Sequence, residues 1–416
     1  MKNSRFAVLN GVFKVLGLLI LSAAAYYVWW ILTLDLQGSF HNSTSLADLN
    51  DDGALDVVVQ NVRNVSEFTA FAVTTLWFNE GDGEFTALRL DDLQLDAGWD
   101  STTGDVDGDG DADLLVFQGT GIRVYFNQGG AQDGTIGEFG SSMSMNMPPN
   151  DGQFGSVLMG DLNNDSYIDA IMIGCCSRLF TVDTEIANPN FSSQWINAST
   201  GEDRLDFEQS VLPALDGFAI PDASLGDLDG DGDLDLFAAV IAPAAGPNRD
   251  PADRVIFNDG TGVFTDSGQR LGDTDSSSVA LGDTDLDGDL DALVGHATGA
   301  SIWINQGGAQ QGQQGVFTLS PNSISGGNTT HVFLSDLDGD NDLDALVAAP
   351  KQAVIWWNDG QAVFTGSHQR FRFTNRHALA IADFNDDGFA DIFAAEYSRD
   401  QRIWYGNGDG TFRTHP

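Results

Sequence analysis

The feature that most constrains the fold is a short acidic loop that recurs along the chain. Its clearest copy is Asp227–Asp235, with the sequence DLDGDGDLD, in which Asp occupies positions 1, 3, 5 and 9 and Gly occupies position 6. Alternate carboxylates in a tight loop converge on one point, where they repel each other unless a cation lies between them. Several hard oxygen ligands on a flexible loop suit calcium better than zinc or magnesium.

Seven such loops occur, and successive loops start 47 to 66 residues apart. A repeat of that length indicates an array of supersecondary units. The candidate calcium ligands, at positions 1, 3, 5 and 9 of each loop, are Asp48, Asn50, Asp52 and Asp56; Asp105, Asp107, Asp109 and Asp113; Asp161, Asn163, Asp165 and Asp169; Asp227, Asp229, Asp231 and Asp235; Asp283, Asp285, Asp287 and Asp291; Asp336, Asp338, Asp340 and Asp344; and Asp383, Asn385, Asp387 and Asp391. We therefore expect up to seven Ca²⁺ ions.

The seven loops differ in two respects. Asn replaces Asp at position 3 of the first, third and seventh loops, and its carbonyl oxygen remains a ligand at one less charge. Position 6 is Gly in five loops, but it is Ser166 in the third and Asn341 in the sixth. Ser tolerates a left-handed turn poorly, so the third loop is expected to be the weakest site.

Each loop is followed by the same pattern of short β segments. An apolar run comes first, as at 234–240, and a second run ends in aromatic residues and Asn, as at 256–258. A Gly-x-Phe segment such as 410–412 closes the unit. Four short strands at this spacing are typical of a propeller blade, so the seven repeats predict an all-β, seven-bladed β-propeller over residues 35–416. In the third repeat, either 179–181 or 195–197 is expected to form the third strand.

The repeat resembles the FG-GAP/VCBS family, whose best-known members are the propellers of integrin α subunits. The resemblance covers nearly all of residues 38–416, because the acidic loop, the aromatic-Asn strand and the Gly-x-Phe segment recur together. It implies calcium in the hairpin between the first two strands of each blade, where the ion mostly stiffens the hairpin. An EF-hand is excluded, because position 12 is apolar, as at Ala238, where an EF-hand loop has a bidentate Glu.

The N-terminal residues predict a membrane anchor. Residues 15–34 form a run of twenty uncharged residues, which as a helix would be about 30 Å long and would span a bilayer core. Residues 1–14 form a short basic lead, which favours a cytoplasmic N-terminus. The chain is thus expected to be a single-pass membrane protein with its propeller on the extracytoplasmic side. Alternatively, Ala23–Ala25 marks a signal-peptidase site.

Charge and motifs restrict the function. The net charge of −43 argues against nucleic acid and against an anionic membrane surface as partners. The sequence has no G-x-S-x-G or H-E-x-x-H motif, so we expect that it is not an enzyme. The leading hypothesis is a protein-interaction or assembly module, and the alternative is a glycan-binding, lectin-like propeller. A polysaccharide lyase or dehydratase ranks last, because such an enzyme needs a basic cluster and the chain has 18 Lys and Arg.

Partners, whether protein or glycan, are expected at the face opposite the calcium loops. Three long segments, 61–75, 140–156 and 241–253, are expected on that face. Met143, Met145 and Met147 alternate in the second of them and form either an adaptable contact surface or an ordinary outer strand. Trp99, His331 and His377 precede their loops and are expected near the mouth of the central channel, as ligand groups or as packing groups.

Overall fold

The computed structural model describes 43–66, 69–81, 83–89, 98, 100–118, 121–128, 139–146, 154–175, 192–197, 207–212, 215, 218–242, 250–307, 314–373, 377–396 and 401–414. These residues belong to one compact unit, which spans His41–Pro416. The predicted transmembrane segment at 15–34 lies outside the described residues. In the part of the chain described, no helix has the length and apolar character needed to cross a membrane.

The described strands pair into antiparallel sheets of consecutive strands, which we number 1 to 7 in chain order. Sheets 1 to 4 contain β1 (Thr44–Ala47), β2 (Asp56–Ser66), β3 (Thr69–Asn79) and β4 (Phe85–Arg89); β5 (Asp100–Gly104), β6 (Asp113–Phe117), β7 (Gly121–Asn127) and β8 (Phe139–Asn146); β9 (Phe154–Gly160), β10 (Asp169–Cys175), β11 (Ser192–Asn197) and β12 (Phe207–Val211); and β13 (Ala219–Gly226), β14 (Asp235–Ile241), β15 (Arg254–Asn258) and β16 (Phe264–Asp266).

The remaining sheets follow the same order. Sheets 5 to 7 contain β17 (Ser276–Gly282), β18 (Asp291–His296), β19 (Gly299–Asn305), β20 (Phe317–Leu319) and β21 (Ile324–Ser325); β22 (His331–Ser335), β23 (Asp344–Ala349), β24 (Gln352–Trp357), β25 (Thr365–Gly366) and β26 (Phe371–Arg372); and β27 (His377–Ala382), β28 (Asp391–Glu396), β29 (Gln401–Gly406) and β30 (Phe412–Thr414). In sheets 5 and 6 the short strands β21 and β26 pair with β19 and β24 beside the fourth strand.

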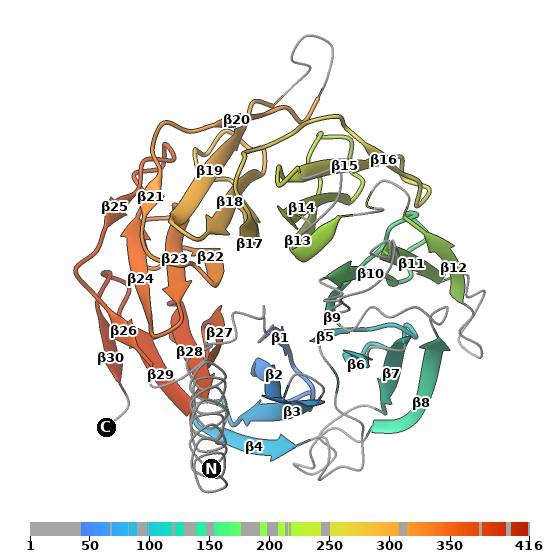
Figure 1. The fold of residues 1–416 in the computed structure, drawn as a ribbon. Coiled ribbons are helices and arrows are strands. Elements are labelled where there is room, and N and C mark those ends of the chain that lie inside the picture. The colour runs from blue at the N-terminus through green and yellow to red at the C-terminus, as the bar shows by residue number, and fades with distance from the viewer. Residues whose placement is uncertain are drawn as a thin grey trace, which may run out of the picture. The chain divides into compact units, whose positions relative to one another are not determined.

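The sheets are arranged around a common axis, with the first strand of each sheet innermost (Figure 1). Neighbouring innermost strands are joined by side chains. Asp100 of β5 accepts a hydrogen bond from the Val157 amide of β9 at 2.8 Å, and Asp222 of β13 accepts one from the Val279 amide of β17 at 3.0 Å. The expectation of an all-β propeller is confirmed.

The second strand of each sheet is buried on both faces, which explains its continuous apolar sequence. In β14, Leu236 and Ala238 pack toward sheet 3, whereas Phe237 and Ala239 pack toward sheet 5. Hydrophobic clusters of this kind fill the space between each pair of consecutive sheets. A further cluster joins sheet 7 to sheet 1 through Phe393 and Trp77, whose rings are 5.7 Å apart. Packing of the first sheet against the last therefore closes the ring.

Two predictions about individual strands can be judged. Residues 195–197 lie in the third strand of sheet 3, as part of β11, and the alternative segment 179–181 lies outside the described residues. Met143 lies in β8, the outer strand of sheet 2, where it pairs with Val124 and packs against the cluster between sheets 2 and 3. The interpretation of Met143 as part of an ordinary outer strand is therefore confirmed, whereas Met147 lies outside the described residues.

Candidate metal centres

Each acidic loop connects the first and second strands of its sheet, and its position 9 is the first residue of the second strand. The loops share one backbone geometry. The residue at position 4 has a positive φ in every loop, from 55° at Asp51 to 80° at Gly108 and Gly339. Position 6 also has a positive φ, from 69° at Asn341 to 99° at Gly110. These two left-handed residues fold nine residues into a tight hairpin.

The carboxylate at position 1 organises the loop interior. In the fourth loop, Oδ2 of Asp227 accepts a hydrogen bond from the amide of Gly232 at 3.0 Å. The equivalent bond to the position-6 amide is present in the other six loops, including the third, where the amide of Ser166 donates to Asp161 at 2.8 Å. The third loop thus adopts the common conformation despite lacking Gly.

Carboxylates converge in the four loops that have Asp at position 3. One oxygen from each of three Asp residues lies within 4.8 Å of the others in each group. The groups are Asp105, Asp107 and Asp113; Asp227, Asp229 and Asp235; Asp283, Asp285 and Asp291; and Asp336, Asp338 and Asp340. The predicted ligands at positions 1, 3 and 9, or 1, 3 and 5, are thus brought together.

Three of the four position-3 carboxylates have an unsatisfied oxygen. Oδ1 of Asp229, of Asp285 and of Asp338 is buried from solvent and has no hydrogen-bond partner among the described residues. Burial and the neighbouring position-5 carboxylate raise the pKa of each of these groups. A buried carboxylate oxygen without a donor is costly, and a hard cation bound among three such groups would satisfy it. The donor set fits calcium.

The loops with Asn at position 3 are arranged differently. The Asn50 amide nitrogen donates to Oδ2 of Asp52 at 2.9 Å, and Asn163 donates to Oδ2 of Asp165 at 3.1 Å. The amide thereby satisfies part of the position-5 carboxylate from within the loop. The carboxylates of the first and third loops therefore depend less on a bound cation to satisfy their oxygens than those of the all-Asp loops do.

The position-9 carboxylates have a second role. Each is 0 or 1% exposed, and both of its oxygens accept backbone hydrogen bonds. In sheet 4, Oδ2 of Asp235 accepts from the Leu228 amide at 2.9 Å and Oδ1 accepts from the Asn258 amide at 2.8 Å. The other sheets repeat this pair of bonds. Position 9 therefore ties the loop to the end of the third strand.

Burial has a further effect on these seven position-9 carboxyl groups. It raises the pKa to about 7 in Asp56, Asp113, Asp235 and Asp344 and to about 6 in Asp169, Asp291 and Asp391. The backbone bonds and a bound cation both favour the ionised form, so they oppose the effect of burial.

The Asn that ends the third strand makes a contact that the sequence did not reveal. Asn258 of sheet 4 donates its side-chain amide to the carbonyl of Leu162, in the acidic loop of sheet 3, at 2.8 Å. Sheets 1, 2, 3, 5 and 6 form the same bond through Asn79, Asn127, Asn197, Asn305 and Asn358. Each such Asn joins its own sheet to the loop of the preceding sheet. Sheet 7 has Gly406 at this position.

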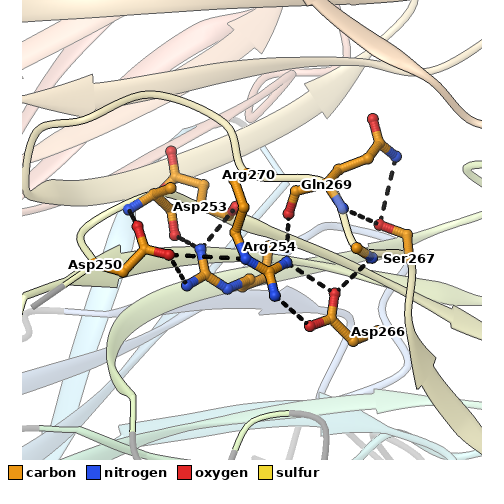
Figure 2. A network of polar contacts seen from close by, with 9 residues as sticks. Asp250, Asp253, Arg254, Asp266, Ser267, Gln269 and Arg270 are labelled. Carbon is orange, nitrogen blue, oxygen red and sulfur yellow. Dashed lines mark hydrogen bonds and ion pairs between the residues drawn. The ribbon is translucent and has the colours of Figure 1, made fainter. Parts of the chain in front are cut away.

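Sheet 4 also holds a polar network that sequence reasoning missed (Figure 2). The side chain of Arg254 is 1% exposed and forms an ion pair with Asp250 at 2.9 Å. Arg270 pairs with Asp266 at 2.9 Å. Asp253 is 3% exposed and accepts hydrogen bonds from the Val240 amide at 2.9 Å and from the Ser276 hydroxyl at 3.1 Å. The network fastens the residues that lead into β15 to β14 and to the start of β17.

Of the three residues predicted to lie near the mouth of the central channel, the structure describes the side chain of His331. A cavity of about 470 Å³ lies among the innermost strands, and His331 lines it together with Asp222 and Ser278. Leu281 and Leu334 line its apolar part. Trp99 lies outside the described residues, as does the side chain of His377. The described residues of the predicted segment at 61–75 lie in β2 and β3.

Sequence comparison identifies the repeat. A family model described as an FG-GAP-like repeat matches residues 48–116, 105–172, 227–294 and 336–394, which include all seven acidic loops. The chain belongs to the FG-GAP-like repeat family. The resemblance inferred from the loops is therefore confirmed, and the protein is an FG-GAP repeat propeller. No curated protein matches the chain at a significant level.

Solved structures resemble this FG-GAP propeller at low identity. A lectin from Agrocybe aegerita that recognises non-reducing terminal N-acetylglucosamine has 16% identity and a TM-score of 0.52, over 82% of this chain and 86% of the lectin. A functionally unknown protein from Desulfotomaculum acetoxidans has 11% identity and a TM-score of 0.49, over 82% and 95% of the two chains. Sqt1 from Chaetomium thermophilum has 12% identity and a TM-score of 0.48, over 88% and 82%. At these identities the likeness to the lectin shows a shared fold alone.

Proposed function

We propose that this FG-GAP propeller is a calcium-stiffened scaffold for protein interaction. In this proposal each of the seven sheets is one blade of a closed ring, and calcium binds in the acidic loops. The observation that carries the proposal is the group of three converging carboxylates in four loops, with a buried, unsatisfied oxygen on Asp229, Asp285 and Asp338. A cation in each loop would remove the repulsion between these carboxylates and fix the hairpin that joins the first and second strands.

A calcium titration followed by native mass spectrometry tests the metal assignment. The wild-type propeller should bind at least four ions, one for each loop with converging carboxylates. Asp229→Asn should lower the number by one at limiting calcium, because it removes a ligand charge from the fourth loop. Asp165→Asn in the third loop is the matched control and should change the first binding steps little. Binding of no calcium, or equal effects of the two variants, would refute the assignment.

Two further features support the interaction role. The propeller offers a large rigid surface, and the sequence has no G-x-S-x-G or H-E-x-x-H motif, so we propose a role without catalysis. Capture from the source membrane in calcium and in chelator should recover one or more proteins only with calcium. Recovery of the same proteins in both conditions would show that the calcium loops do not support the interaction.

Glycan binding is the second candidate, since the similar lectin binds N-acetylglucosamine on a related fold. A glycan array probed in calcium distinguishes the two candidates. Selective binding to one terminal sugar, competed by that free sugar, would favour the lectin-like function over protein interaction.

We also propose that residues 15–34 anchor the protein in a membrane with the propeller on the extracytoplasmic side. The proposal rests on the uncharged run of twenty residues behind a basic lead. The protein should stay with membranes after a carbonate wash. A soluble protein whose first residue follows Ala25 would show instead that the segment is a cleaved signal.

A further inference from the structure

Basic residues are scarce in this chain, yet they gather near its end. Seven of the 18 Lys and Arg residues lie between Lys351 and Arg413. Among the described residues five of these are exposed, and we call four of them, Lys351, Arg370, Arg372 and Arg402, the cationic ridge. The fifth, Arg413, pairs with Asp387. Among the described residues, none of the four forms an ion pair with an acidic side chain.

The ridge rests on a rigid aromatic base. Residues 370–373 alternate between exposed and buried positions, so Arg370 and Arg372 point outward while Phe371 and Phe373 point inward. The inward rings are 3% and 8% exposed, and each meets the Trp404 ring edge-on, at 5.3 and 5.7 Å. The outward arginines are therefore presented from a backbone that packing holds in place.

Sheets 6 and 7 both contribute to the ridge. Arg402 of β29 donates Nη1 to the carbonyl of Arg372 at 2.9 Å, and its guanidinium lies 5.7 Å from the Trp404 ring centroid. The Phe373 amide donates to the Lys351 carbonyl at 3.0 Å. Arg370 donates Nη1 to the Ser367 carbonyl at 2.7 Å. These bonds place the backbone of the 370–373 segment beside the start of β24 and beneath the Arg402 side chain of β29.

The ridge lies away from the acidic loops. Lys351 sits in the hairpin between β23 and β24, and Arg402 is the second residue of β29. Both positions are at the ends of the second and third strands opposite the acidic loop. A ligand on the ridge therefore does not compete with calcium for the same groups.

The composition of the ridge indicates the chemistry of its ligand. Arg outnumbers Lys three to one, and a guanidinium pairs with a carboxylate through two parallel hydrogen bonds. The aromatic rings beneath are buried, so they offer no exposed face on which a sugar would stack. Arg370 and Arg372 are two residues apart on an extended segment, a spacing of roughly 7 Å that matches alternate side chains of another extended peptide.

We propose that the cationic ridge binds an extended acidic segment of a partner protein, with carboxylates at alternate positions facing Arg370 and Arg372. This inference rests on the proposed interaction function and names the chemistry of the partner. Arg402 and Lys351 complete the row of positive charge on which the segment lies.

The test uses the full-length protein in detergent or the secreted propeller, according to which form the cell makes. Its probes are two fluorescent peptides of equal composition, one alternating Glu and Thr and one with Glu and Thr in separate blocks. Binding is measured by anisotropy in calcium at low and at physiological salt. The test variant is Arg372→Gln with Arg402→Gln. The control is Gln361→Glu with Thr318→Glu, two exposed positions away from the ridge that change the net charge equally.

The alternating peptide should bind more tightly than the block peptide, and more weakly at higher salt. The ridge variant should lose roughly tenfold in affinity, since each exposed charge pair contributes up to about fivefold, while the control stays near wild type. Equal losses in both variants, or equal binding of both peptides, would each overturn the inference. If the ridge variant still binds calcium and captures its protein partner in calcium, only this inference fails and the proposed function stands.

Discussion

At the residue scale, the repeated Asp residues divide into two kinds of group. Positions 1 and 3 are half-buried and position 5 is exposed, whereas position 9 is buried and bonded to two backbone amides. The spacing of the loop could predict that the four side chains belong together. The spacing could not show that position 9 also holds the third strand. Asp235 accepts a hydrogen bond from the Asn258 amide, which lies 23 residues further along the chain.

The side chain of Asn258 should contribute to stability between sheets. Asn258→Ala leaves the buried carbonyl of Leu162 without this donor, so we expect a loss of about 1–3 kcal/mol in the free energy of unfolding. Asn407→Ala is the matched control, since that exposed Asn bonds only to exposed groups of its own hairpin, Thr411 and Arg413, and should cost less than about 0.5 kcal/mol. Denaturant unfolding in calcium measures both variants. Equal losses would show that the bond between sheets is not stabilising.

The buried Asp253 should make stability depend on pH. Burial raises its pKa from 3.8 to about 7. A carboxyl with a raised folded pKa stabilises the protein below its unfolded pKa, and this stabilisation is lost as the pH rises through about 7. Asp253→Asn removes the ionisable group and keeps the acceptor for the Val240 amide. We therefore expect the variant to gain about 1–3 kcal/mol relative to wild type between pH 5 and pH 8.

Melting curves across that pH range check the prediction. Asp359→Asn, at an exposed position in sheet 6, is the control and should show no such gain. A difference between Asp253→Asn and wild type that stays constant from pH 5 to pH 8 would mean that the carboxyl does not change its charge in this range.

At the element scale, the sequence predicted the hairpins well, because each loop carries its own turn signals. The start of each second strand at position 9 follows from the apolar run behind it. The strand at 195–197 was recognisable from its aromatic-Asn ending, although the repeat around it is degenerate. The fourth strands were harder to define. In sheets 5 and 6 the short strands β21 and β26 continue the outer edge, and no periodicity marks segments of two residues.

Position 6 of the loop should respond to substitution according to its φ. A Cβ added at Gly232, where φ is 96°, meets nothing within 4 Å, so Gly232→Ser should cost about 1 kcal/mol through backbone strain alone. Ser166 adopts φ 73° in the third loop, so Ser166→Gly should stabilise by a similar amount. Thermal melts in calcium compare the two variants with wild type. If both substitutions shift the melting temperature in the same direction, the strain argument is wrong.

At the scale of the whole molecule, the contacts between sheets are what the sequence could not supply. The repeat pattern predicts each sheet separately, whereas bonds between sheets join residues that are far apart in the sequence. The Asn79 side chain, for example, donates to the Phe384 carbonyl 305 residues away. The Tyr405 hydroxyl likewise donates to the Gly83 carbonyl at 2.8 Å. These bonds, with the hydrophobic cluster between sheets 7 and 1, join the last sheet to the first and close the ring. The cationic ridge was also missed, because its residues come from separate hairpins.

The central claim is that calcium in the acidic loops stabilises the ring, and chelation tests it most directly. Melting curves should be recorded in saturating calcium, in magnesium and in chelator, with released metal quantified in the last. Binding to the folded state stabilises by about 2.7 kcal/mol per site at a hundredfold excess over the dissociation constant. Chelator should therefore lower the melting temperature by about 10 °C or more, and magnesium should restore little of it. An unchanged melt in chelator, with no metal released, would contradict the account.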